Sequence, residues 1–242
     1  MRLIKFIILG IGLTLTIFLF YSCLDDDDYS STRIWSSIAT VHPLEDSKSF
    51  WLSLDGGTSL LPVSTNIPSY EPKEKQRAFI VYSILSDEYR EYDHAVRILD
   101  LKSILTKPIA ENMGEKNDSI YGTNPVEISD IWIGGGYLNI TFEFHYGGFS
   151  VHYINLLKTD SVETPFLFEF RHHAYDDDDR YKRKGIVAFD LSKIDTNGEE
   201  VELSIKVKTF EGNKNYTIRY NSSKIPDSQT RSYLMDNFIE IR

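Results

Sequence analysis

The chain has 242 residues and carries 36 acidic and 26 basic side chains, which gives a formal net charge of −10 at pH 7. Such an acidic chain lacks the basic surface that attracts nucleic acid or anionic lipid headgroups, so we expect no nucleic-acid partner. Its 15 tyrosines and 14 phenylalanines favour strands, and its length allows one or two domains.

Residues 1–22 have the layout of a secretory signal peptide. Arg2 and Lys5 provide a short basic start, and an apolar run without charge extends from Phe6 to Tyr21. A basic start, an apolar run and a small residue before the cut are typical of a segment that is removed during export. A membrane anchor needs about 20 apolar residues. The run from Phe6 to Tyr21 is close to this length, so an uncleaved anchor is the alternative.

Cys23 is the only cysteine of the chain and directly follows the predicted signal peptide. A single cysteine cannot form an intramolecular disulfide, so it needs another role. The segment from Phe20 to Cys23, with Ser22 before the cysteine, resembles a bacterial lipobox. We therefore predict that Cys23 is lipidated and becomes the first residue of a protein anchored in the outer membrane.

Four aspartates follow the cysteine almost at once: Asp25, Asp26, Asp27 and Asp28. Adjacent like charges repel, which predicts that residues 23–29 form an extended, solvated tether. A lipidated cysteine followed by an acidic run also resembles the surface-export signal of Bacteroidetes lipoproteins. This resemblance predicts that the protein faces the cell surface, with the periplasm as the second choice.

Residues 30–107 are predicted to form a small barrel. Apolar residues alternate with other side chains from Phe50 to Leu54, which places Trp51 on the outer face, and Asp55-Gly56 marks a hairpin. The expected strands are residues 34–44, 50–54, 58–63, 76–85 and 94–104. Five short strands and one long loop with prolines fit an OB-like barrel, with an SH3-like barrel as the alternative.

The second half of the chain is predicted to be an immunoglobulin-like β-sandwich, residues 125–242. Strict alternation from Leu138 to Phe144 and from Val201 to Val207 indicates half-buried antiparallel strands. Glycine-containing turns separate about seven such strands. Residues 108–124 are polar and contain Pro108 and two glycines, so we expect a linker with room for one helical turn. The predicted fold class is all-β.

Several segments of the chain resemble the NigD-like lipoproteins of Bacteroidetes. They are residues 35–41, 66–68, 80–86, 131–135, 152–156 and 169–172. The resemblance implies a lipoprotein signal, an N-terminal OB-like domain and a C-terminal β-sandwich. The name of this family comes from a bacteriocin gene cluster, which makes immunity one implied function. The matching segments contain no catalytic signature.

The histidines do not form a recognisable catalytic or metal-binding pattern. They are His42, His94, His145, His152, His172 and His173. No His-Glu-x-x-His or Gly-x-Ser-x-Gly motif is present in the sequence. We therefore expect partly buried structural histidines, no metal, no cofactor and no catalytic residue.

The aspartate run from Asp176 to Asp179 is the densest acidic cluster of the predicted folded part. It departs from a calcium loop, because Arg180 stands where that pattern needs Asp or Asn, and we favour a solvated loop. Two further sites, Ser119 and Ser161, match a short O-glycosylation pattern of secreted Bacteroidetes proteins and fall in predicted loops.

These features predict a non-catalytic binding or accessory module that presents loops and aromatic side chains to a protein partner. Trp51 is the aromatic residue that we expect to take part, because exposed tryptophans are favoured at interfaces. Two alternatives stay open. One is a metal-dependent or hydrolytic enzyme with a site between the two domains, and the other is a bacteriocin-associated immunity protein.

Overall fold

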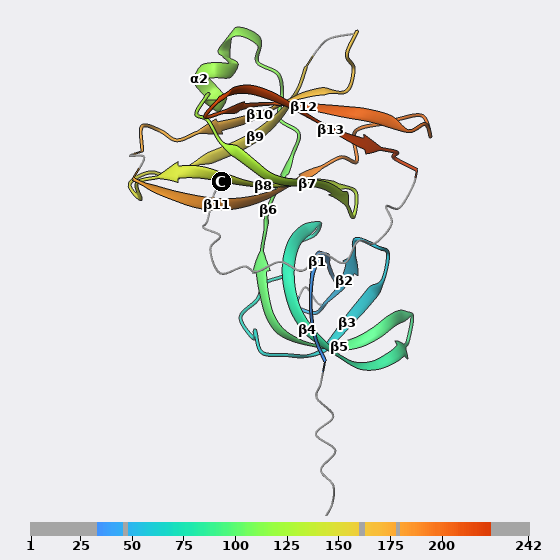
Figure 1. Cartoon of the computed structure of the whole chain (residues 1–242). Coiled ribbons are helices and arrows are strands. Elements are labelled where there is room, and N and C mark those ends of the chain that lie inside the picture. Colours follow the sequence, from blue (N-terminus) through green and yellow to red (C-terminus); the bar gives the residue numbers. More distant parts are fainter. Residues whose placement is uncertain (1–32, 46–47, 160–162, 178–179, 224–242) are drawn as a thin grey trace, which may run out of the picture. The chain divides into compact units, whose positions relative to one another are not determined.

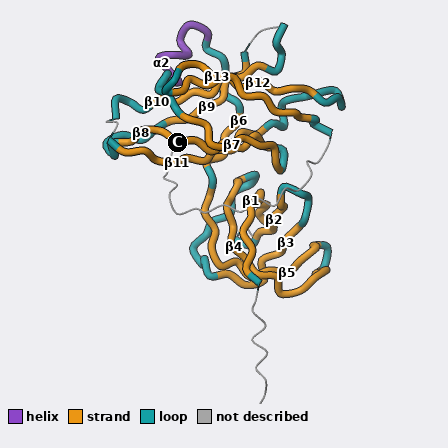
Figure 2. Tube along the Cα trace, in the orientation of Figure 1, coloured by secondary structure: helices purple, strands orange, loops and turns teal. Residues whose placement is uncertain are grey.

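The described part of the chain is built from strands, with one short helical segment that lies between β6 and β7 in the sequence and on the sandwich in space (Figures 1 and 2). The computed structural model describes residues 33–45, 48–159, 163–177 and 180–223. The predicted signal peptide, Cys23, the four aspartates after it and Ser161 lie outside these residues.

The first half forms a closed barrel with the strand order β1-β2-β3-β5-β4. Its strands are β1 (Ile34–Pro43), β2 (Phe50–Leu54), β3 (Ser59–Thr65), β4 (Gln76–Tyr89) and β5 (Tyr92–Ser103). Strands β3 and β5 run parallel, and the other neighbouring strands run antiparallel. Val41, Leu52, Ile80 and Ile98 are fully buried inside the barrel. The five-stranded barrel and the hairpin at Asp55 are as the alternation predicted.

The second half is a sandwich of two four-stranded sheets, ordered β13-β12-β10-β9 and β6-β11-β8-β7 (Figure 1). Its strands are β6 (Leu105–Pro108), β7 (Glu127–Gly134), β8 (Tyr137–Tyr146), β9 (Tyr153–Lys158), β10 (Leu167–His173), β11 (Tyr181–Asp190), β12 (Val201–Thr209) and β13 (Gly212–Tyr220). The alternating residues from Leu138 to Phe144 and from Leu203 to Val207 point into one shared core. This core confirms the predicted sandwich.

Strand β6 is the element that the sequence did not reveal. Leu105 and its neighbours pair in parallel with Val187 and the following residues of β11, so residues 105–108 add an edge strand to the sandwich. Four residues are too few to show a period of two, and their partner strand lies about eighty residues away in the sequence. Beyond β6, the predicted linker contains a 3₁₀ turn, η2 (Gly114–Lys116), and the one-turn helix α2 (Asn117–Tyr121).

Barrel and sandwich share a buried apolar cluster and belong to one compact unit. The cluster combines barrel and connecting residues with residues of the sheet that contains β7, β8 and β11: Ile38, Phe79, Ile104, Trp132, Tyr137, Ile186 and Ala188. Burial of each large apolar side chain contributes about 1.5–3 kcal/mol. The outer faces of β1 and β4 are therefore packed surfaces at this position and not solvent-exposed ones.

A buried arginine lies at the same junction. Arg77 on β4 is 0% exposed, and its Nη2 forms an ion pair of 2.6 Å with Asp55 Oδ1. Its Nη1 donates to Thr40 Oγ1 at 3.0 Å, and its guanidinium lies 5.1 Å from the centre of the Tyr137 ring. A Cβ atom at Gly134 would come within 2.0 Å of Asp55 Oδ2, so this position requires glycine.

Candidate functional site

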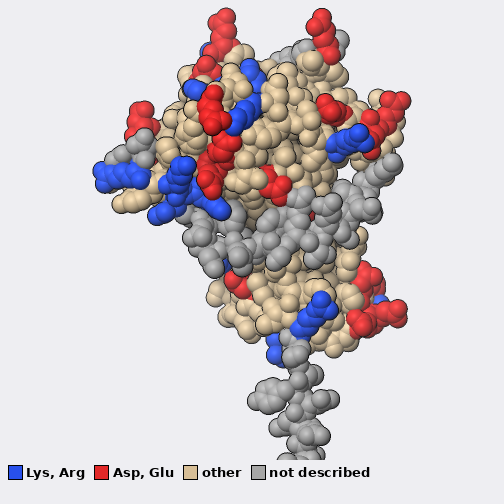
Figure 3. All heavy atoms as spheres, in the orientation of Figure 1, with Lys and Arg blue, Asp and Glu red and all other residues tan. Residues whose placement is uncertain are grey.

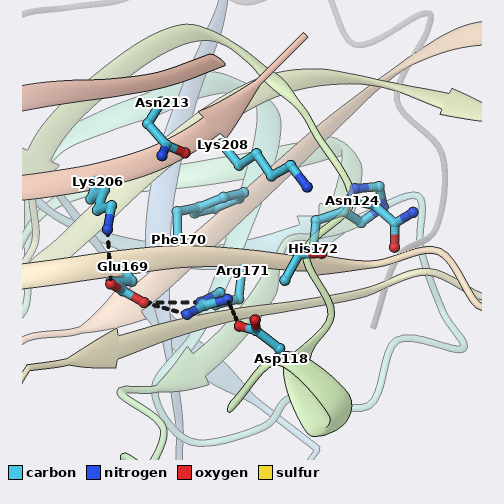
Figure 4. A pocket seen from close by; sticks show the side chains of 10 residues that line it. Asp118, Asn124, Glu169, Phe170, Arg171, His172, Lys206, Lys208 and Asn213 are labelled. Carbon is cyan, nitrogen blue, oxygen red and sulfur yellow. Dashed lines mark hydrogen bonds and ion pairs between the residues drawn. The ribbon is translucent and has the colours of Figure 1, made fainter. Parts of the chain in front are cut away.

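A polar cavity of about 420 Å³ opens on the outer face of the β13-β12-β10-β9 sheet (Figure 4). The residues around it come from α2 and the segment after it, from β10, from β12 and from the start of β13: Asp118, Thr123, Asn124, Glu169, Phe170, Arg171, His172, Lys206, Lys208 and Asn213. A cavity of this size is within the range of sites for small ligands.

Strand alternation explains why charged side chains gather in this pocket. Phe168, Phe170 and His172 of β10 point into the sandwich core or its buried end, which turns Glu169 and Arg171 outward. Leu203, Ile205 and Val207 of β12 are buried in the same way, which turns Lys206 and Lys208 outward. The parallel register of β10 and β12 sets Glu169 opposite Lys206. The two strands therefore place four charged groups on one surface.

Glu169, Arg171 and Lys206 form a chain of ion pairs with Asp118 of α2 (Figure 4). Arg171 Nη1 binds Asp118 Oδ1 at 2.7 Å, and Nε and Nη2 of the same guanidinium bind Glu169 Oε2. Lys206 Nζ lies 3.6 Å from the other oxygen of Glu169. Burial acts to lower the pKa of Arg171, but its hydrogen bonds to Asp118 and Glu169 outweigh this effect and raise the pKa. Two cations and two carboxylates cancel within this network.

Lys208 and Asn124 supply hydrogen-bond donors beside this neutral network. Within the described ranges, no carboxylate forms an ion pair with Lys208, and Figure 4 shows its side chain extending toward Asn124. The Oδ1 atom of Asn124 accepts a hydrogen bond from the Ala174 N–H at 3.0 Å, which fixes the orientation of the amide. Its NH₂ group is therefore the part that is left to bind a ligand.

A chain of three titratable side chains lies buried behind the wall of the pocket. The three residues are linked in the order His172, His152 and Asp177. His172 Nε2 lies 2.9 Å from His152 Nδ1, and His152 Nε2 lies 3.0 Å from Asp177 Oδ2. The side chains of His152 and Asp177 are 1% and 0% exposed, and His172 is 3% exposed. Burial, followed by the influence of His152, lowers the pKa of His172 to about 3. His172 is therefore neutral near pH 7.

Asp177 is held by backbone donors as well as by His152. Gly147 and Gly148 donate their N–H groups to Oδ2 at 2.8 and 3.1 Å, and Phe149 donates to Oδ1 at 3.0 Å. Desolvation acts to raise the pKa of Asp177, but the hydrogen bonds from Phe149, His152 and the glycines hold it well below its usual range. The predicted solvated loop is thus wrong for Asp177, because its carboxylate pins the β8–β9 loop to the β10–β11 loop.

The contacts of this chain limit where its protons can lie. The ionised Asp177 faces Nε2 of His152, and one proton lies between His152 Nδ1 and His172 Nε2. His172 Nδ1 is buried without a hydrogen-bond partner of ordinary length in the described part of the chain, and the backbone of Pro125 and Asn124 acts to raise the pKa of this ring. The arrangement stores no exposed base or nucleophile, so it is a structural latch between two loops.

Family comparisons match both halves of the chain. Residues 38–104 match the model of the NigD-like N-terminal OB domain, and residues 108–220 match the model of the NigD-like C-terminal beta sandwich domain. The chain belongs to the NigD-like family. The predicted resemblance and the predicted order of the two folds are confirmed. No curated protein matches the sequence.

Solved structures of similar proteins extend over most of this NigD-like chain. A protein from Parabacteroides distasonis ATCC 8503, named as a candidate toxin-related protein, is 45% identical with a TM-score of 0.74, and the match covers 79% of this chain and 95% of that one. A NigD-like immunity protein from Bacteroides caccae ATCC 43185 is 21% identical with a TM-score of 0.58 and coverages of 80% and 98%. A candidate lipoprotein from Bacteroides fragilis NCTC 9343 is 15% identical with a TM-score of 0.57 and coverages of 79% and 100%.

The structure of the NigD-like chain brings together two of the six histidines, His152 and His172, and separates the others. His145 points away from His152 and packs on Phe210 with ring centres 4.5 Å apart. His42 is on the barrel, where its ring stacks on Trp51 at 4.0 Å. Within the described ranges, no group of three or more His, Cys, Asp or Glu residues is placed to hold a metal ion.

Trp51 lies on the outer face of the barrel, as its alternation with buried neighbours predicted, but it is only half exposed. Besides His42, the ring of Tyr92 lies 5.8 Å from it. Its role in an interface stays a prediction.

Ser119 of α2, one of the two predicted glycosylation sites, is exposed and donates to the Lys116 carbonyl at 2.9 Å.

The pocket itself was not predicted from the sequence. Its charges come from three separate segments, α2, β10 and β12, and the register of β10 and β12 brings Glu169 opposite Lys206. The feature of the sequence that could have indicated the pocket is the pair of outward lysines on β12.

Among the described residues, no helix is long and apolar enough to cross a membrane.

Proposed function

We propose that this NigD-like protein is a lipid-anchored protein of the outer membrane that acts as a non-catalytic binding or accessory module, with the outer-sheet pocket as its binding site. The observation that supports this function is the network of Arg171, Glu169 and Asp118, which holds the pocket wall in a fixed arrangement before any ligand binds. Rigid sheets that present such preformed polar groups are typical of binding sites. Both signs of charge are interspersed on the face drawn in Figure 3, in agreement with a protein that is not a general polyanion binder.

The anchor rests on Cys23 and on the candidate lipoprotein among the similar structures. Cys23→Ala should leave the protein unprocessed or released from the membrane, because no acyl chain can then be attached. Replacing Asp25, Asp26, Asp27 and Asp28 with alanine should keep the protein in the membrane but lower its cleavage by protease added to intact cells. Membrane fractionation and surface proteolysis measure these effects. A processed C23A protein that stays in the membrane would contradict the anchor, and unchanged proteolysis would contradict the export signal.

The binding site can be tested by filling the pocket. Asn213 lies at its edge on β13 and is exposed, so Asn213→Tyr should block the cavity without disturbing the core. Asn215→Tyr is the matched control, because Asn215 is exposed on the same strand two residues further on and does not line the pocket. After cross-linking in native membranes, N213Y should retain at least tenfold less bound partner or ligand than the wild type, whereas N215Y should behave as the wild type. Equal recovery with N213Y would contradict the proposal.

Two other functions have different tests. The name of the similar structure from Bacteroides caccae favours immunity, which predicts that cells without the protein become sensitive to a bacteriocin. The buried Asp177–His152–His172 chain is the arrangement closest to catalytic machinery. A hydrolytic activity that is lost in His152→Ala while the fold is intact would favour an enzyme over a binding module.

A further inference from the structure

We propose that the outer-sheet pocket recognises a small ligand with one carboxylate group, bound by Lys208 and by the amide groups of Asn124 and Asn213. This inference rests on the proposed binding function and adds the chemical class of the ligand. It follows from the charges of the pocket, from the donors that are left over and from the register of the strands.

The first argument is the net charge of the pocket. Arg171 and Lys206 balance Glu169 and Asp118, so these four groups leave no net charge for a ligand. Lys208 adds one positive charge that no described carboxylate compensates. Lys208 is exposed at the cavity, so it attracts a negative group as a surface cation does, and this attraction decreases with added salt. The pocket is therefore suited to one negative charge.

The donors point to the same ligand. A lysine ammonium offers three N–H donors and no acceptor. The Oδ1 atom of Asn124 already accepts from the Ala174 N–H, and the two NH₂ donors of this amide are left for a ligand. Asn213 lies opposite Lys208 in the β12–β13 pair and lines the same cavity, so its amide offers a further donor to a ligand. A ligand that satisfies these groups must bring acceptors, as a carboxylate does.

The acidic residues limit the charge of the ligand. Asp118 and Glu169 line the same cavity, and a dianion such as phosphate or sulfate would lie near their carboxylates. Arg171 and Lys206 are already paired with these carboxylates, so Lys208 alone is left to balance a ligand charge, which favours a monoanion over a dianion. The cavity of about 420 Å³ has room for a sugar acid or an acylated amino acid.

The experiment measures binding of defined probes to the full-length lipidated protein in detergent by isothermal titration calorimetry. Glucuronate and N-acetylalanine carry the carboxylate on two different scaffolds, and glucose and N-acetylalanine amide are their neutral counterparts. At least one acid should bind tenfold or more tightly than its neutral counterpart, and which acid binds separates a sugar-acid from an amino-acid source. Inorganic phosphate should bind more weakly than that acid.

Lys208→Met and Lys206→Met form the matched pair of variants, since both lysines are exposed on the same face of β12. K208M should weaken binding of the acid at least tenfold, whereas K206M should change it less than threefold, because Lys206 is already paired with Glu169. Lys208→Arg should restore most of the affinity. Equal thermal midpoints of the three variants show that the fold is intact.

The outcomes separate this inference from the proposed function. If the neutral probes bind as tightly as the acids, or if K208M binds like the wild type, the monocarboxylate assignment is wrong although the pocket still binds a ligand. Tighter binding of phosphate would also overturn it. If no probe binds and N213Y still captures the native partner, both the assignment and the pocket are wrong.

Discussion

Replacing Arg77 with alanine should lower the free energy of unfolding by about 3–5 kcal/mol, which is the largest effect that we expect from a single substitution in this chain. The Arg77 side chain is fully buried and forms a short ion pair with Asp55, whose side chain is 23% exposed. Removing one partner leaves the other charge at the junction without compensation. It also leaves Thr40 Oγ1 without its donor.

The position of Arg77 extends the effect beyond local stability. Thr40, Asp55 and Arg77 belong to the barrel, whereas Asn139, at 3.4 Å from Nη2, and the ring of Tyr137 belong to β8 of the sandwich. The loss of Arg77 should therefore weaken the coupling of the two halves. Because the two halves share a buried cluster, we expect a single calorimetric transition for the wild type and a broadened or split transition for R77A.

Urea denaturation at 25 °C and scanning calorimetry measure the two effects. Arg97→Ala is the control, because Arg97 is exposed on β5 and its removal should change stability by less than about 0.5 kcal/mol. Arg77→Lys keeps the charge but not the planar fork that binds Asp55 and Thr40 together, so it should be intermediate. Stability of R77A within about 1 kcal/mol of the wild type would show that the buried pair is not needed.

The burial of strand residues could be predicted from the sequence, whereas the contacts of Arg77 and the pocket could not, and this difference has a physical cause. Alternation along one strand predicted that Leu138, Leu52 and their neighbours are buried, because the side-chain period depends on local geometry alone. The role of Arg77 was not predictable, since a single arginine in an apolar strand gives no sign of a partner carboxylate in a distant hairpin. The same holds for Lys208, which joins Asn124 and Arg171 only through the pairing of β10 with β12 and of β12 with β13.

The histidines show which part of the latch formed by Asp177, His152 and His172 could be predicted from the sequence. The sequence predicted partly buried structural histidines, and His152 and His172 are buried, whereas His145 packs on Phe210. What it could not show is that two antiparallel strands, β9 and β10, bring His152 and His172 within hydrogen-bond distance. Nor could it show that Asp177 turns inward, because runs of acidic residues are usually solvated.

The latch leads to the second large effect, which is a loss of stability in mild acid. The folded pKa of His172 is about 3, whereas an unfolded histidine titrates near 6.5. Between these values the unfolded chain binds a proton that the folded chain excludes, so stability is complete above about pH 6.5 and decreases as the pH falls toward 3. The slope should approach about 1.4 kcal/mol per pH unit. The charged or titratable groups near His172 are His152, Asp177 and His173.

Asp177 extends the loss of stability to lower pH. Its folded pKa is depressed, so its contribution is present above the unfolded value near 3.9 and is lost as the pH falls through the folded value. Asp177→Asn should cost about 2–4 kcal/mol at pH 7, because one amide cannot accept from three backbone N–H groups and from His152. Asp176→Asn is its control. Asp176 has φ of 57°, a conformation that asparagine tolerates well.

The substitution His172→Gln isolates the titration from the packing. A glutamine amide can still donate to His152 Nδ1, but it cannot take up a proton, so the slope between pH 6.5 and 4 should flatten. His94→Gln is the control, because His94 pairs with the exposed Asp87 on the barrel, far in sequence from the latch. Urea midpoints at half-unit pH steps give both slopes. Parallel plots of stability against pH for the wild type and H172Q would mean that the buried histidine does not set the acid sensitivity. A flat plot for H172Q beside an unchanged plot for H94Q would assign the acid sensitivity to His172, which links the pocket wall to the two loops.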